Sequence, residues 1–114
     1  MWYTNRAYFD TLRSAATAAI GATYATIGTA FTDRPVVIKF TNLTNGDVVV
    51  STDGVNDMLF LPAGAFTLID IRTNAPNETD LTLPVGTQFY VKDGTTPSTT
   101  GSFYIEAVII KALP

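Results

Sequence analysis

The chain has 114 residues with no Cys, no His and a formal net charge of −3. This length fits one domain with a single modest core. The absence of Cys excludes disulfides and thiolate metal sites, and the absence of His removes the commonest general base and metal ligand. Charged residues make up 15% of the chain, against about 25% in ordinary soluble domains. Because charge is depleted at the cores of interfaces, this favours a protein that assembles over a Thr-coated monomer.

The seven Lys and Arg residues are scattered singly along the chain, so no basic patch is expected to bind nucleic acid. The first ten residues lack the basic start and apolar run of a signal peptide. The apolar run at 15–20 is much shorter than the roughly 20 residues that a membrane span needs. We therefore expect neither nucleic acid nor membrane as a partner, and a cytosol-like compartment for synthesis.

Residues 1–14 differ from the rest in their density of aromatic side chains, including the single Trp at position 2. Tyr8, Phe9 and Leu12 have the spacing of a short helix, but a terminal segment can equally be an extended arm. The arm either docks on a neighbouring subunit or packs back on its own domain, and both interpretations stay open. We treat 1–14 as a docking arm and 15–114 as one domain.

From Ala15 onward, alternating apolar residues and turn residues indicate an all-β domain. About eight short antiparallel strands predict a jelly-roll-like β-sandwich. In the strand at 36–40, Val36, Ile38 and Phe40 face inward and Lys39 faces water. The expected strands are 15–20, 25–31, 36–40, 48–52, 58–61, 65–71, 87–92 and 102–111, with a further short one at 81–83.

Three turns organise the middle of the chain. Asn45-Gly46 predicts a two-residue hairpin that joins the strands at 36–40 and 48–52. Asp53-Gly54 and Pro62-Ala63-Gly64 predict two reversals on either side of the strand at 58–61, because Gly supplies the backbone freedom that tight turns need. The Thr-rich segment 95–101 is expected to be an exposed loop.

The last strand is apolar on both faces in its second half. Phe103, Ile105, Ala107 and Ile109 lie on one face, and the residues between them lie on the other. A strand that is apolar on both faces is covered on both faces, here by another subunit or by the N-terminal segment. The predicted subunit contacts are Trp2, Tyr3, Tyr8, Phe9, Leu12, Tyr104, Val108 and Ile110.

Acidic residues are the only candidates for chemistry. Asp53, Asn56 and Asp57 form a fragment of a calcium loop without its late Glu, and Asp or Asn in a turn usually bonds the backbone. Glu78 and Asp80 imitate a glycosidase pair but lie in a polar loop with nothing to raise a pKa. No nucleophile elbow occurs, and no His could activate a hydroxyl. We expect no enzyme, no metal and no cofactor.

Five motifs, in this order, resemble a family of small tailed-bacteriophage virion proteins. They are PVVIKFTN at 35–42, STDGVND at 51–57, FLPAG at 60–64, LPVGTQFYVK at 83–92 and GSFYI at 101–105. The resemblance covers 15–110, and the N-terminal segment and Met58, where the family pattern suggests a polar residue, depart from it. It implies a structural protein encoded among head and tail genes.

The resemblance and the composition together predict a multi-copy head or neck protein, used for capsid decoration or stabilisation or in a head–tail collar. Its partners would be capsid, portal, neck or tail subunits and further copies of itself, in a virion assembled in the bacterial cytoplasm. The alternative is a module on the tail or capsid surface that binds a glycan or receptor through Tyr side chains and polar loops.

Overall fold

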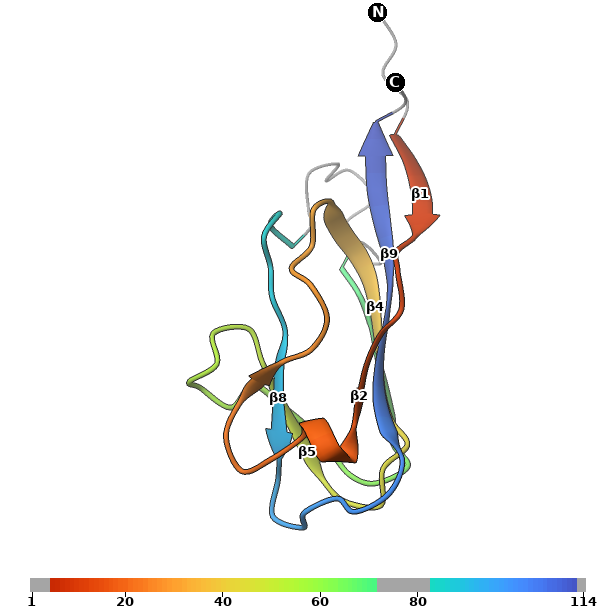
Figure 1. The fold of residues 1–114 in the computed structure, drawn as a ribbon. Helices are drawn as coiled ribbons and strands as arrows, with labels where there is room; N and C mark the ends of the chain where they lie inside the picture. The colour runs from red at the N-terminus through yellow and green to blue at the C-terminus, as the bar shows by residue number, and fades with distance from the viewer. Residues whose placement is uncertain (1–4, 72–82, 113–114) are drawn as a thin grey trace, which may run out of the picture.

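The computed structural model describes residues 5–71 and 83–112, which form two packed antiparallel sheets (Figure 1). The prediction of an all-β sandwich is confirmed. The elements of the described part are β1 (Asn5–Phe9), β2 (Arg13–Ala16), the 3-10 turn η1 (Thr17–Ala19), β3 (Ala25–Thr26), β4 (Arg34–Asn42), β5 (Val48–Ser51), β6 (Leu59–Leu61), β7 (Phe66–Asp70), β8 (Tyr90–Asp93) and β9 (Ser102–Ala112).

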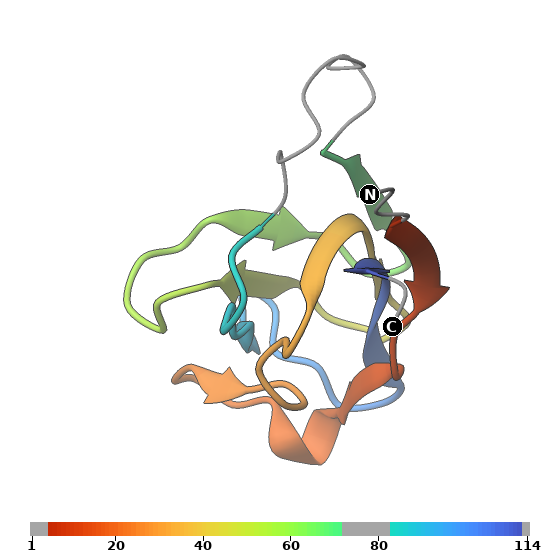
Figure 2. The same ribbon diagram turned by 90° about the horizontal axis from the view of Figure 1, so that it is seen from above.

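The two layers contain different numbers of strands. The long sheet has the order β1-β9-β4-β7, with β2 also paired to β9, and the short sheet has the order β3-β8-β5-β6. From β2 to β9 the chain changes sheet at every step except between β5 and β6. The view along the strands in Figure 2 shows the loop after β5 (yellow-green) projecting away from the long sheet.

The core lies between the sheets and follows the predicted alternation. Val36, Ile38 and Phe40 of β4 are buried, and so are the four inward residues of β9. Phe89, which precedes β8, packs edge-to-face on Phe40 with ring centroids 5.2 Å apart. Each inward position therefore adds apolar burial, the main favourable contribution to folding.

The predicted hairpin between β4 and β5 is wrong, because these strands belong to different sheets. Asn42, fully buried, fixes the crossing instead. Its amide nitrogen donates to the carbonyls of Gly46 (2.9 Å), Leu61 (3.0 Å) and Pro62 (3.1 Å). Its side-chain oxygen accepts from the backbone N–H and the hydroxyl of Thr44 at 3.0 and 2.6 Å. One side chain thus satisfies the backbone of two crossings, at β4–β5 and β6–β7.

Gly46 serves close packing rather than a hairpin turn. A Cβ built there would lie 2.4 Å from the carbonyl oxygen of Thr96, so the loop before β5 packs directly on the loop after β8. The reversals at Asp53-Gly54 and Pro62-Ala63-Gly64 are confirmed. Gly54 and Gly64 have φ of +72° and +77°, and Ala65 N–H donates to Pro62 O at 3.1 Å. Segment 95–101 is exposed as expected, apart from half-buried Ser98.

The small-residue region 15–31 contains less strand than predicted. Only β2 and the two-residue β3 are regular, and η1 takes the place of the strand expected at 15–20. Ile27 and Phe31 are still buried, and their N–H groups donate to Phe89 O and Thr87 O at 3.0 and 2.9 Å. Of the strand predicted at 81–83, residues 81 and 82 lie outside the described residues and Leu83 is not in a strand.

Replacing Asn42 by Ala should lower the free energy of unfolding by about 3 kcal/mol, because several buried backbone groups lose their partners. Urea unfolding followed by circular dichroism measures this loss. The matched control is Asn45→Ala, which removes exposed side-chain bonds to Thr99 and Thr100 and should cost about 1 kcal/mol or less. Equal losses in the two variants would show that Asn42 does not fix the crossing.

Candidate assembly surface

Residues 5–16 lie along β9 of their own chain, as β1 and β2. Residues 5–9 are extended, so the short helix suggested by the spacing of Tyr8, Phe9 and Leu12 does not form. Phe9 pairs with Val108 and Arg13 pairs with Ile105, so three residues of the N-terminal segment oppose two of β9. Such a bulge switches the side to which the following residues point. Phe9 therefore faces outward and Arg13 faces the core.

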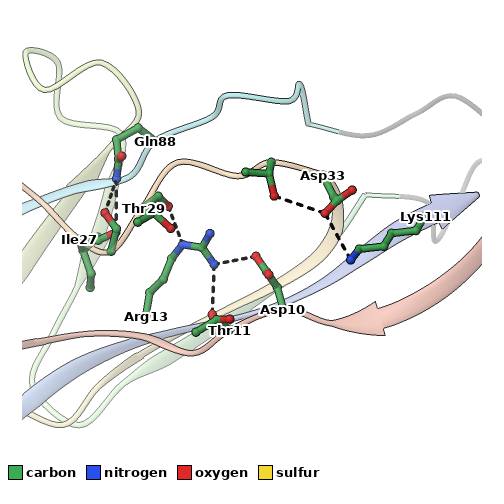
Figure 3. Close-up of polar contacts among 10 residues, drawn as sticks. Asp10, Thr11, Arg13, Ile27, Thr29, Asp33, Gln88 and Lys111 are labelled. Carbon is green, nitrogen blue, oxygen red and sulfur yellow. Dashed lines mark hydrogen bonds and ion pairs between the residues drawn. The ribbon is translucent and has the colours of Figure 1, made fainter.

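Arg13 anchors this segment (Figure 3). Its side chain is only 6% exposed. Nε donates to Thr29 O at 2.9 Å, and Nη1 forms an ion pair with Asp10 at 2.9 Å. The guanidinium carbon stands 3.8 Å from the ring centroid of Phe31. A buried charge is tolerated when it is paired and hydrogen-bonded, so Arg13 fixes the segment from inside while Phe9 stays outside.

Gly28 makes room for this anchor. Its φ is +66°, and an added Cβ would lie 2.5 Å from Cγ of Arg13. Both the backbone conformation and the close approach therefore require Gly at this position.

The outward side chains of the long sheet form an exposed and mostly apolar surface, which we call the outer face. Cross-strand partners point to the same side of a sheet. The register gives four rows across it: Ala7–Ile110–Arg34, Phe9–Val108–Val37–Asp70, Glu106–Lys39–Leu68 and Ser14–Tyr104–Thr41–Phe66. Its large apolar members Phe9, Phe66 and Leu68 are 91%, 63% and 59% exposed.

The charges at the centre of the outer face are one anion and one cation. Glu106 and Lys39 lie opposite each other on β9 and β4, and Lys39 Nζ stands 5.1 Å from the ring centroid of Phe66. Beside them, Thr41 Oγ1 is buried and has no hydrogen-bond partner within residues 5–71 and 83–112. The centre of this surface therefore carries no net charge.

The structure brings together half of the predicted contact residues. The outer face contains Tyr104, Val108 and Ile110, which alternate along β9 with buried residues. It also contains Phe9, which is the cross-strand partner of Val108. Tyr8 points to the other side, where Lys111 Nζ lies 5.6 Å from its ring centroid. Leu12 lies in the bulge and is 54% exposed. Trp2 and Tyr3 lie outside the described residues.

Sequence reasoning missed Phe66 and Leu68. Their alternation within the strand at 65–71 was visible, but nothing in the sequence places that strand beside β4. Of the Tyr residues considered for glycan binding, the three that the structure describes lie on different surfaces, and glycan binding stays a prediction. Tyr104 is on the outer face, Tyr8 is on the opposite side of the long sheet, and Tyr90 lies in the short sheet against Gly54.

The acidic tip of the β5–β6 loop serves its own backbone, as predicted. Asp53 Oδ1 accepts from the N–H groups of Val55 and Asn56, both at 2.8 Å, and from Ser51 Oγ at 2.7 Å. The bonds from Asn56 and Val55 hold the pKa of Asp53 well below its ordinary value. Its acceptor sites are therefore occupied by the loop.

Asp57 ties the same loop to the short sheet. It accepts a hydrogen bond from Tyr24 OH at 2.5 Å and pairs with Lys92 Nζ at 3.2 Å. The Tyr24 bond and then Lys92 lower the pKa of Asp57, while burial, and then Asp57 itself, raise the pKa of Tyr24. In the part of the chain that the structure describes, no cluster of three acidic side chains could hold a metal ion. Glu78 and Asp80 lie outside that part.

No family model and no curated protein matches this chain, so its resemblance to tailed-phage virion proteins stays a prediction. The fold is similar to a solved structure of Bacillus endospore appendages, described as a novel family of disulfide-linked pili. The TM-score is 0.52 at 14% identity, and the alignment covers 96% of this chain and 90% of the other. At this identity the likeness shows the fold alone.

The described ranges 5–71 and 83–112 contain no helix with the length and apolar character of a membrane span.

Acidification should destabilise the protein partly through Asp53. The pKa of Asp53 is lower in the folded protein than in the unfolded chain. The ionised carboxylate therefore adds to the free energy of unfolding above the unfolded pKa of about 3.9, and this stabilisation is lost as the pH falls from about 5 through 4 and below. Asp53→Asn should flatten the fall of the urea midpoint between pH 5 and 3. Parallel pH profiles for the two proteins would show that the carboxylate does not contribute.

Proposed function

We propose that this chain is a non-enzymatic structural subunit that acts in several copies and binds its neighbours through the outer face. The observation that carries the proposal is the exposure of Phe9, 91%, beside Val108 on the same strand pair. Large apolar side chains gathered on one exposed face mark surfaces that bind other proteins. A rigid sheet also loses little conformational entropy when it binds.

The pattern of charges suits a second copy of the same face. In a two-fold contact the same patch meets itself. Glu106 of one copy can then face Lys39 of the other, and the reverse pair forms by symmetry. Phe9, Phe66 and Leu68 would be covered around this central pair. Charge complementarity of this kind sets orientation more than affinity. Burial of the surrounding apolar side chains, Phe9, Phe66 and Leu68, supplies the free energy of association.

A virion is the setting that the sequence resemblance favours, with the subunit at the head or neck as a decoration, stabilisation or collar protein. The strand orders β2-β9-β4-β7 and β3-β8-β5-β6 support describing the sandwich as a jelly roll, a fold that occurs in viral capsids. The likeness to a pilus protein supports, at the level of fold, the use of such a sandwich in assemblies. Because this chain has no Cys, its contacts would be non-covalent.

Deleting the N-terminal segment is a poor test of this proposal, because it also removes β1 and the buried Arg13. Point changes on the outer face avoid this problem. Phe66 and Leu68 are exposed and lie on the edge strand β7, so replacing them leaves the core intact.

The double variant Phe66→Ser, Leu68→Ser should weaken self-association by about 100-fold, about 3 kcal/mol, because two apolar side chains are no longer buried at the interface. Light scattering over a dilution series measures this, and the variant should be lost from phage particles. The control is Phe60→Ser, which removes another exposed Phe (53%) from the short sheet and should leave both properties unchanged. A wild-type protein that is monomeric at all concentrations would contradict self-association through this face.

A further inference from the structure

The two seams of the sandwich are closed to different degrees. Arg13 and Phe31 fill the seam beside β2. On the opposite side, where β6 and β7 are the edge strands, the seam contains a pocket of about 270 Å³. Ile69 lies at the mouth of this pocket: it pairs with the buried Ile38 on the inner side of the long sheet, yet it is 40% exposed. Ile71 and Leu83, the described residues on either side of segment 72–82, line the pocket as well.

The pocket is apolar and shaped by both sheets. Ile38 and Phe40 line it from the long sheet, Val50 and Leu59 line it from the short sheet, and Met58 stands at the rim. A cavity of about 150 Å³ lined by such side chains stays dry and binds benzene. A pocket of about 270 Å³ therefore suits one larger aromatic group, such as an indole.

The chain has one indole, that of Trp2, which is three positions before the start of β1 at Asn5. β1 begins at Asn5, opposite Ala112, on the far side of β9 and β4 from β7. Three strand spacings place β1 about 14 Å from β7, and the pocket lies several residues further down the sheet. Three residues span at most about 10 Å, which is shorter than the distance between β1 and the pocket of the same chain.

We infer that the pocket receives the Trp2 side chain of a second copy of this chain. The inference rests on the proposed function, because it requires self-association, but it uses a different surface from the outer face. Trp2 precedes β1 in the sequence and the pocket adjoins β7, and these two strands form opposite edges of the long sheet. Such a contact joins unlike surfaces and can repeat from copy to copy.

The fluorescence of Trp2 tests this directly, since no other Trp contributes to the emission. On raising the protein concentration, the emission should shift to shorter wavelength as the indole leaves water. Ile69→Lys, which places a charge at the mouth of the pocket, should abolish the shift. Met58→Lys, at a rim residue that is 54% exposed, gives the same blockade if the first variant does not fold. The matched control is Leu68→Lys on the outer face of the same strand, which should keep the shift.

Mixing two variants shows whether the contact is between chains. The Ile69→Lys chain keeps its Trp2 but has a blocked pocket, and a Trp2→Ala chain has an intact pocket but no Trp emission. Neither alone should give a concentration-dependent shift, and adding the second to the first should restore it.

Two results would overturn the inference. In the first, the emission is already at short wavelength in the most dilute sample and does not change when the Trp2→Ala chain is added. This would mean that Trp2 is buried in its own domain. The other is an unshifted emission while light scattering shows association, which would leave contact through the outer face standing without the pocket. Weaker but not abolished association in Leu68→Lys, together with a retained shift, would instead separate the two surfaces as inferred.

Discussion

Strand β9 holds the long sheet together, because it pairs with β1 and β2 on one side and with β4 on the other. Phe103, Ile105, Ala107 and Ile109 point inward from it and are all buried. The residues between them point outward into the exposed outer face. The same eleven residues therefore supply the centre of the core and the centre of the candidate contact surface. A change in the pairing of β9 would alter both at once.

The bulge between β1 and β2 controls what the N-terminal segment presents. Without the extra residue, strict alternation would put Phe9 and Arg13 on the same side of the sheet. With it, the cation enters the sandwich and the aromatic ring stays outside. The two interpretations of this segment are thus compatible for the described residues. The backbone packs on its own domain, while Phe9 remains available to a neighbour.

Alternation within single strands was predictable from the sequence, and relations between strands were not. The burial of Ile38, the turns at Gly54 and Gly64, and the local role of Asp53 all depend on a few neighbouring residues. Asn45-Gly46 gave a wrong hairpin prediction because a turn dipeptide indicates only the local backbone preference and not which strands pair. The crossing it lies in is fixed by Asn42, through partners about twenty residues away. For the same reason Phe9 and Val108 were recognised as contacts, whereas Phe66 and Leu68 joined the surface only once the strand order was known.

The open seam and the outer face differ in the kind of contact that they permit. A flat face with adjacent opposite charges can meet itself across a two-fold axis, which closes after two copies. A pocket cannot meet itself and needs a projecting group from elsewhere on the chain, so its contact continues from one copy to the next. A subunit that has both surfaces can form pairs and then link the pairs into rows. Because the chain has so few charged residues, little long-range repulsion between copies opposes the addition of further pairs to a row. The size of the assembly would then depend on shape complementarity and apolar burial.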